Sequence, residues 1–308
     1  MEDITNDAWL NQLLDEYRLA DDFYEDRSIR WGEFIQPSSD PRPDLTSGSL
    51  RIAVIGSMPV GLLTLKTLLS YARHFPDRLH IVCLLTDDAA NPEAKIAVRK
   101  RIWHVYPAEV QRRIEFTTIR SALDAGIPVY TGDIKTDWFR STFSELNPDA
   151  VICCGYGQRI DGPILKVPRL GIYNLHPADL AHGFGAGPAM YDDSKARDAE
   201  TTCWTVHLMN EALDAGPIIG SSPPINIRMS NGDFPQSKAD YYTKVMDGLD
   251  YLTFHTVNSL IAWHRNGQTS PMKHLDFETL FPNTIKRWMM EPIREFPEHV
   301  APDPALFS

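Results

Sequence analysis

The sequence contains few cysteines and no long apolar segment. Its 308 residues include four cysteines, none in a CxxC pair or a zinc-binding spacing. Each cysteine lies in or beside an apolar run, which favours buried thiols in a reducing compartment over a disulfide framework. No run of about 18 apolar residues is present, and the N-terminus lacks a basic start followed by an apolar stretch. We therefore expect a cytoplasmic protein with no membrane segment and no bound metal.

Basic residues are also in the minority. Lys and Arg total 30 against 41 Asp and Glu, which gives a net charge of -11. Because phosphate neutralisation supplies most of the affinity for nucleic acids, this balance predicts a small-molecule substrate and no nucleic-acid partner. Hydrophobic residues make up 43% of the chain, enough for a substantial core.

Residues 1–49 differ in composition from the rest of the chain. Their first half has apolar residues at helical spacing, and their second half is rich in proline and serine, as in a linker. We expect this helical extension to pack on the body of the protein or against a second copy, which would form a homodimer. The body covers residues 50–265, and residues 266–308 form a Pro-rich C-terminal tail.

The first half of the body alternates apolar runs with amphipathic segments. The runs have the profile of buried strands and cover residues 51–56, 79–86, 126–130 and 150–157. Such alternation predicts βαβ units and an α/β fold with a doubly wound, mostly parallel, Rossmann-like sheet.

The pattern changes after Gly171. Residues 201–209 alternate between apolar and polar side chains and predict an antiparallel strand, which residues 216–227 continue after a turn. One long helix is expected from about Lys238 to Trp263, because its apolar residues fall near one face.

The turn after the first strand does not have the pattern of a nucleotide-binding loop. In GSMPVG at residues 56–61, Met58 replaces the second glycine of G-x-G-x-x-G, and its side chain would obstruct a pyrophosphate. A Walker-type loop and a G-x-S-x-G nucleophile elbow are also missing. Cys153 and Cys154 sit in an apolar run, which disfavours a reactive thiolate. We therefore expect the two glycines of this turn to serve packing.

Three short segments carry polar residues suited to catalysis. They are CCGYGQRI at 153–160, GIYNLHPADL at 171–180 and TVHLMNEALDAGPII at 205–219. Alone, each has an ordinary explanation, since a histidine after a strand is often structural and an Asp-Ala-Gly sequence often forms a turn. Their order and spacing, however, resemble the folate-dependent formyltransferases, whose signature is Asn-x-His-Pro followed by Thr-Val-His and Asp-x-Gly. That family includes glycinamide ribonucleotide transformylase, methionyl-tRNA formyltransferase and nucleotide-sugar N-formyltransferases.

The resemblance implies formyl transfer from N10-formyltetrahydrofolate to an amine, without a metal. Asn174 would donate an amide N–H to the oxyanion of the tetrahedral intermediate. His176, two residues on, would face the same side of the strand and stabilise that charge or relay a proton. Asp214 would support His176 or accept the amine proton through water. These three residues are the predicted catalytic group.

The loop after the fourth apolar run is the predicted cofactor-binding segment. By resemblance it lines the pterin pocket largely through backbone groups, and its residues are Tyr156, Gly157, Gln158, Arg159 and Ile160. The alternative is a plain glycine turn. His207 is interpreted as a supporting or core histidine.

The segment after the first motif departs from the family. Members commonly continue as Ser-Leu-Leu-Pro, then an aromatic or basic residue and Gly, whereas residues 178–188 read ADLAHGFGAGP. This loop normally helps to shape the acceptor site, and its glycines could admit a larger acceptor or let the loop move as a lid. The sequence therefore leaves the identity of the formyl acceptor open.

Two branches of the family fit this chain poorly. The turn at 57–59 lacks the phosphate-binding cluster of the glycinamide ribonucleotide branch, and the acidic, Pro-rich end lacks the basic domain of the tRNA branch. Amino-sugar nucleotides are slightly favoured as acceptors, with N-hydroxyornithine-type siderophore precursors as the alternative. A formyltetrahydrofolate hydrolase would use the same three residues, and a folate-binding module without catalysis is a further hypothesis.

Overall fold

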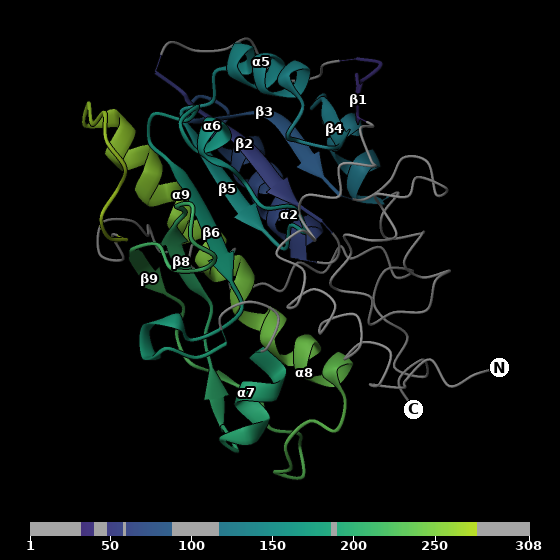
Figure 1. Ribbon diagram of the computed structural model, residues 1–308, viewed down its shortest axis with the longest axis vertical. Coiled ribbons are helices and arrows are strands. Elements are labelled where there is room, and N and C mark those ends of the chain that lie inside the picture. Colours follow the sequence, from purple (N-terminus) through teal and green to yellow (C-terminus); the bar gives the residue numbers. More distant parts are fainter. Residues whose placement is uncertain (1–31, 40–47, 58–59, 88–116, 186–189, 276–308) are drawn as a thin grey trace, which may run out of the picture.

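The computed structural model describes residues 32–39, 48–57, 60–87, 117–185 and 190–275 (Figure 1). The helix expected near the N-terminus, Met58 and most of the C-terminal tail lie outside these residues.

One twisted sheet forms the centre of the protein. Its strand order is β1-β4-β3-β2-β5-β6-β8-β9, and the pairs from β4 through β6 are parallel. In that order the strands are Gly32–Ile35, Val129–Gly132, Leu79–Thr86, Leu50–Gly56, Ala150–Cys154, Ile172–His176, Thr205–Leu208 and Ile218–Ser221. The parallel part confirms the predicted α/β fold, and the antiparallel β8 and β9 confirm the change of pattern after residue 171. Strand β1 was not predicted: it pairs antiparallel with β4, so part of the N-terminal extension belongs to the sheet.

Helices cover both faces of the sheet. Two hydrophobic clusters lie on opposite faces, one containing residues of α2 (Val60–His74) and α9 (Leu249–Arg265), the other residues of α5 (Asp137–Leu146) and α6 (Gly162–Leu165). Cys154 belongs to the first cluster and Cys153 to the second, as expected for adjacent residues of a strand. At the lower end of Figure 1 lie α7 (Met190–Ala196) and α8 (Lys238–Val245).

Smaller elements lie outside the main sheet. A separate two-stranded sheet pairs β7 (Thr201–Thr202) with β10 (Ile225–Asn226), and a 3-10 helix, η2, covers Leu180–His182. No helix among the described residues is long and apolar enough to cross a membrane.

The expectation of one long helix from Lys238 was wrong. The chain forms α8, a 3-10 turn at Met246–Gly248 (η4) and then α9. The indole N–H of Trp204 donates to the carbonyl of Val245 at 2.6 Å, which removes that carbonyl from a continuous helical ladder. A Cβ atom on Gly248 would lie 2.5 Å from Ile225 Cδ1, so the glycine lets the turn pack closely on β10. Trp204 and Ile225 are distant from this helix in the sequence, so the helical periodicity did not predict the break.

The glycines of the first turn serve packing, as predicted. A Cβ atom on Gly61 would lie 2.4 Å from the carbonyl carbon of Gly56, and one on Gly56 would lie 2.6 Å from the carbonyl oxygen of Cys154. Helix α2 therefore starts in direct backbone contact with the end of β2.

A buried carboxyl lies between α2 and α9. Thr67 Oγ1 donates to Asp250 Oδ1 at 3.2 Å. Burial raises the pKa of Asp250 from 3.8 to about 6, an effect that the Thr67 hydrogen bond opposes and the nearby charge of Asp247 reinforces. A carboxyl whose pKa is higher in the folded state stabilises the fold at low pH, and this contribution is lost as the pH rises through about 6.

We expect Asp250→Asn to stabilise the protein at neutral pH. The free energy of unfolding should rise by on the order of 1–2 kcal/mol at pH 7.5, and the gain should disappear near pH 4. Urea unfolding at a series of pH values measures the difference. His255, whose pKa is lowered by burial to about 4, has its own pH dependence, but it contributes equally to both proteins. Asp124→Asn, at an exposed position, is the control; a gain independent of pH would contradict the prediction.

Candidate active site

The predicted catalytic residues lie where β6 and β8 run antiparallel. Asn174 and His176 are two residues apart on β6 and therefore project from the same face. In the register, His207 is directly opposite Asn174, and Thr205 is opposite His176. The Asn-x-His and Thr-Val-His motifs are thus adjacent in space because their strands pair.

Asp214 approaches this pair from the loop between β8 and β9. Its Oδ1 lies 3.4 Å from Asn174 Nδ2, and its Oδ2 lies 3.8 Å from His176 Nδ1. The side chains of Asp214 and His176 are each 9% exposed. The amide, imidazole and carboxylate expected from the sequence are therefore brought together, close to solvent but largely enclosed.

The loop that carries Asp214 depends on close backbone contact. Asp214 adopts a left-handed conformation with φ of 48°, which Asp tolerates better than most residues. Two residues later, a Cβ atom on Gly216 would lie 1.7 Å from the carbonyl oxygen of Leu208. The Asp-x-Gly sequence is therefore required to turn the chain back onto β8 with the carboxylate facing β6.

The ring of His176 has a defined orientation. Its Nε2 lies 2.7 Å from the carbonyl oxygen of Gly185. A carbonyl can only accept, so Nε2 carries a proton in both the neutral and the charged ring. The other nitrogen, Nδ1, faces Asp214 at 3.8 Å, beyond direct hydrogen-bond length. Proton exchange with the site therefore has to pass through Nδ1.

His207 lies on β8 and contacts both Asn174 and Asp214, which agrees with its interpretation as a supporting residue. It is 1% exposed, and its Nε2 lies 3.0 Å from Asn174 Nδ2 and 3.6 Å from Asp214 Oδ1. Because the amide nitrogen donates, Nε2 accepts and the ring proton sits on Nδ1. His207 thereby holds the amide nitrogen of Asn174 toward Asp214.

The predicted cofactor-binding loop is tied to the ends of neighbouring strands. The backbone N–H of Gly157 donates to Asp87 Oδ2 at 2.6 Å, and Gln158 Nε2 donates to Asp87 Oδ1 at 2.7 Å. Asp87 directly follows β3, and its own N–H donates to Ser57 Oγ after β2 at 2.9 Å. Asp87 thus links the ends of β2, β3 and β5 at the carboxyl edge of the parallel strands, through its carboxylate and its backbone N–H.

The side chains of this loop are used in different ways. Gln158 and Ile160 are buried, with 4% and 2% exposure, and Gln158 Nε2 also lies 2.9 Å from Tyr156 Oη. Arg159 is exposed and donates to the carbonyl of Glu211 at 2.7 Å, which links this loop to the Asp214 loop. The role of the five residues in folate binding stays a prediction, and the buried pair could serve a ligand only through their backbone groups.

The thiol beside the site is unsuited to nucleophilic chemistry. Burial raises the pKa of Cys153 well above its ordinary range, and electrostatic interaction with Cys154, Asp214 and Asp87 adds to the effect. This agrees with the sequence-based argument against a cysteine nucleophile. Among the described residues, no three His, Cys, Asp or Glu side chains group as metal ligands do.

Several residues of the site were missed from the sequence. Asp87 had a detectable signal, because it is a charged residue at the end of a buried apolar run. Thr205, which donates to the carbonyl of Ala178 at 2.7 Å and anchors the loop after β6, lay inside a recognised motif but had no assigned role. Gly185, the acceptor for His176, gave no signal, since its contact depends on how the loop folds back.

Comparison with known proteins agrees with this geometry. The sequence model of the formyl transferase family matches residues 132–246, which include all three predicted catalytic residues. The methionyl-tRNA formyltransferase of Pseudoalteromonas translucida is 30% identical over 203 residues, which cover 63% of this chain and 59% of that protein. Residues 132–246 of this chain are thus similar to the formyl transferases. A second similar protein, the methionyl-tRNA formyltransferase of Parvibaculum lavamentivorans, is 37% identical over 101 residues, 32% of each chain. The matches span less than two thirds of these relatives' lengths.

Solved structures of the family share the fold. Glycinamide ribonucleotide transformylase 1 from Symbiobacterium toebii superposes with a TM-score of 0.53 at 16% identity, covering 77% of this chain and 98% of that one. Phosphoribosylglycinamide formyltransferase from Anaplasma phagocytophilum gives a TM-score of 0.51 at 17% identity, covering 70% and 88%. At these identities the likeness establishes the Rossmann-like fold alone.

Proposed function

We propose that this protein transfers the formyl group of N10-formyltetrahydrofolate to the amine of a small metabolite. The observation that carries the proposal is the convergence of Asn174, His176 and Asp214, with the Asp214 carboxylate between the amide at 3.4 Å and the imidazole at 3.8 Å. In the reaction the amine nitrogen bonds to the formyl carbon, the bond from that carbon to the folate nitrogen breaks, and one amine proton ends on the folate nitrogen.

Asn174 serves as the donor to the oxyanion. Its amide nitrogen carries two hydrogens and faces two acceptors, His207 at 3.0 Å and Asp214 at 3.4 Å. The contact with Asp214 is the longer and therefore the weaker one. The hydrogen directed at Asp214 can be redirected to the developing charge, while His207 keeps the amide in place. A neutral donor of this kind stabilises the oxyanion without losing a proton.

His176 and Asp214 manage the proton. The gap of 3.8 Å between Nδ1 and Oδ2 is too long for a hydrogen bond but short enough for a water or a reacting atom to bridge. Asp214 accepts the proton that the attacking amine releases and passes it across this gap to His176 Nδ1. His176, with Nε2 held by Gly185, delivers a proton through Nδ1 to the departing nitrogen.

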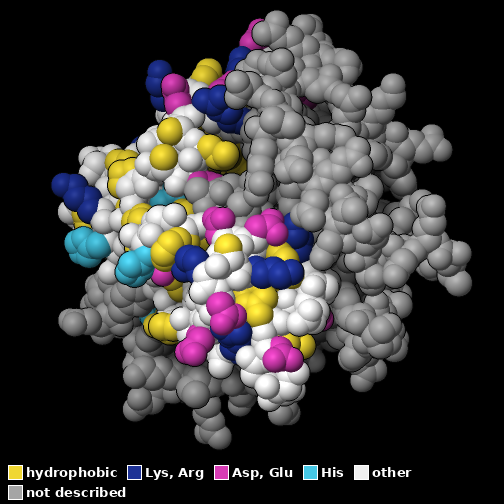
Figure 2. Space-filling model, turned by 60° about the horizontal axis from the view of Figure 1, so that its bottom comes forward, with side chains coloured by type: hydrophobic (Ala, Val, Ile, Leu, Met, Phe, Trp, Pro, Cys, Tyr) yellow, Lys and Arg dark blue, Asp and Glu magenta, His cyan; other side chains and the backbone are white. Residues whose placement is uncertain are grey.

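The acceptor that we propose first is an amino-sugar nucleotide. The relatives' names specify methionyl-tRNA and phosphoribosylglycinamide as their substrates, but features of this chain support another acceptor. Its net charge is -11, and the described part of the face in Figure 2 mixes acidic with basic side chains instead of gathering basic ones. Gly56 and Gly61 are in backbone contact with each other, which agrees with a packing role for these glycines. N-hydroxyornithine-type amines are the alternative acceptors.

A panel of amines tests the proposal. The purified protein is incubated with N10-formyltetrahydrofolate and, separately, an amino-sugar nucleotide, N-hydroxyornithine, glycinamide ribonucleotide or methionyl-tRNA, and mass spectrometry detects the gain of a formyl group. We expect formylation of an amino-sugar nucleotide. Formylation of another amine alone would correct the acceptor class, and steady formate release without any amine would replace transferase by hydrolase. No turnover of the folate under any condition would refute the activity.

A further inference from the structure

The acceptor for His176, Gly185, sits in a tightly packed segment. Gly185 has φ of 67°, and a Cβ atom there would lie 2.6 Å from the Cβ of Ala178 and 3.1 Å from that of Met190. The carbonyl of Gly185 accepts from His176 Nε2 at 2.7 Å. The orientation of the imidazole therefore depends on the orientation of one peptide group.

Helix α7 and the turn that follows it hold this segment with two side chains four residues apart. Asp193 Oδ2 accepts from the backbone N–H of Gly185 at 2.9 Å. The guanidinium carbon of Arg197 lies 3.3 Å from the ring centroid of Phe184. Positions four residues apart lie on one face of a helix, so both side chains reach the same stretch of loop.

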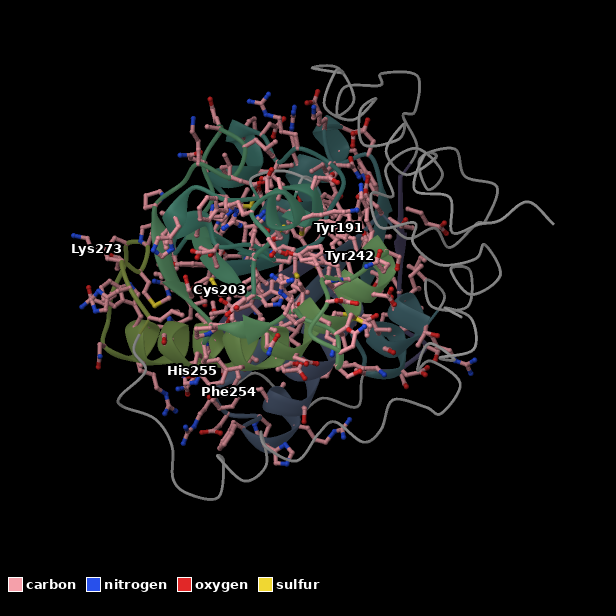
Figure 3. The ribbon with its side chains drawn as sticks, turned by 90° about the horizontal axis from the view of Figure 1, so that it is seen from below. Tyr191, Cys203, Tyr242, Phe254, His255 and Lys273 are labelled. Carbon is pink, nitrogen blue, oxygen red and sulfur yellow. The ribbon has the colours of Figure 1, made fainter. Side chains whose placement is uncertain are left out.

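Helix α7 is itself firmly seated against α8. Ser194 Oγ and Tyr241 Oη are 2.9 Å apart, and the rings of Tyr191 and Tyr241 pack edge to face with centroids 5.6 Å apart. Figure 3 shows Tyr191 close to Tyr242, where the two helices meet. These contacts hold the backbone of α7, which carries Asp193, in place against α8.

We propose that Asp193 is a positioning residue, which sets the proton arrangement of His176 by anchoring Gly185. The anchored N–H and the carbonyl flank the same Cα atom, so fixing one peptide group restricts the rotation of the other. With the carbonyl held toward Nε2, the neutral ring carries its proton there and keeps Nδ1 directed at Asp214. Without the anchor the carbonyl turns away, and the neutral ring places its proton on Nδ1, which faces the negative charge of the Asp214 carboxylate. The ring then presents a donor where the reaction needs an acceptor at the start of each cycle. This catalytic consequence rests on the proposed formyl transfer.

Steady-state kinetics distinguish a positioning role of Asp193 from a general loss of structure. We expect Asp193→Ala to lower kcat about 10-fold and to change KM for the folate by less than about 2-fold, because a misoriented catalytic group affects the reaction more than binding. Asp193→Asn keeps an oxygen that accepts from Gly185 and should retain at least about half of kcat. Lys195→Ala, on the exposed side of the same helix, is the control and should match the unchanged protein.

A spectroscopic readout is independent of catalysis. In protein labelled with 15N-histidine at pH about 9, above the ordinary histidine range, the long-range 1H–15N spectrum reports which ring nitrogen carries the proton. The His176 signal is identified by its loss in His176→Gln. We expect the proton on Nε2 in the unchanged protein and in Asp193→Asn, and a shift toward Nδ1 in Asp193→Ala.

The kcat values and the His176 tautomer together distinguish the positioning role of Asp193 from the proposed formyl transfer. An unchanged tautomer in a folded Asp193→Ala would overturn the positioning role, whatever the activity. Loss of kcat in Asp193→Asn equal to that in Asp193→Ala would overturn it as well, because the acceptor oxygen is retained; this isosteric variant also decides the matter if the alanine variant fails to fold. If the tautomer shifts as expected but no formyl transfer is found, the positioning role stands and the proposed function fails.

Discussion

His176→Ala is expected to lower kcat by about 10²-fold or more while the protein stays folded. The imidazole is the group that delivers the proton, and its Nδ1 faces Asp214 across a gap of 3.8 Å. Alanine leaves the strand pairing of β6 and β8 unchanged, since that pairing uses the backbone. Steady-state kinetics of formyl transfer and thermal unfolding, taken together, test this expectation.

Asn174→Ala should give a loss of similar size for a different reason. It removes the oxyanion donor, an effect typically worth about 10²–10³ in kcat. It also leaves His207 Nε2 without its donor at 3.0 Å.

His182→Ala is the matched control for the loss of the imidazole in His176→Ala, because the His182 side chain is 72% exposed in the loop after β6 and pairs with Asp179. Turnover of His176→Ala close to that of the unchanged protein would eliminate the catalytic role of this residue.

Gly216→Ala is expected to disrupt both activity and stability. The added Cβ would lie 1.7 Å from the carbonyl oxygen of Leu208, which belongs to β8 and cannot yield without disturbing the pairing of this strand with β6. The loop must therefore move and carry Asp214 away from Asn174 and His176. We expect the free energy of unfolding to fall by about 2 kcal/mol or more, by analogy with other overpacked sites, and kcat to fall by about 10²-fold because a displacement of about 1 Å has that effect.

Gly267→Ala provides the matched control for this substitution. A Cβ atom there meets nothing within 4 Å, and the cost arises only from its φ of 73°. A left-handed alanine costs about 1 kcal/mol, so this variant should lose that much stability and keep its activity. Equal losses in the two variants, measured by urea unfolding, would show that the close contact at Gly216 has no special importance.

Much of the site was predictable because its motifs are local. Asn174 and His176 share a face through the two-residue period of a strand, whatever the fold around them. Asp214 and Gly216 form a turn whose residue types follow from its backbone geometry. The resemblance to a family then joined these pieces, whose meeting in space no local rule supplies. The predicted pterin loop could be located at a strand end, but the inward direction of Gln158 follows from its contacts with Asp87.

The sequence alone determined the alternation of buried strands and amphipathic helices, because hydrophobic periodicity is imposed by which faces the core covers. Only the tertiary structure decided where helices break and which distant groups meet. Trp204 ends α8 by binding the carbonyl of Val245, and Asp193 reaches the backbone of Gly185 to fix the ring of His176. Such contacts depend on relative positions of elements far apart in the chain, and side-chain pattern within one element does not encode them.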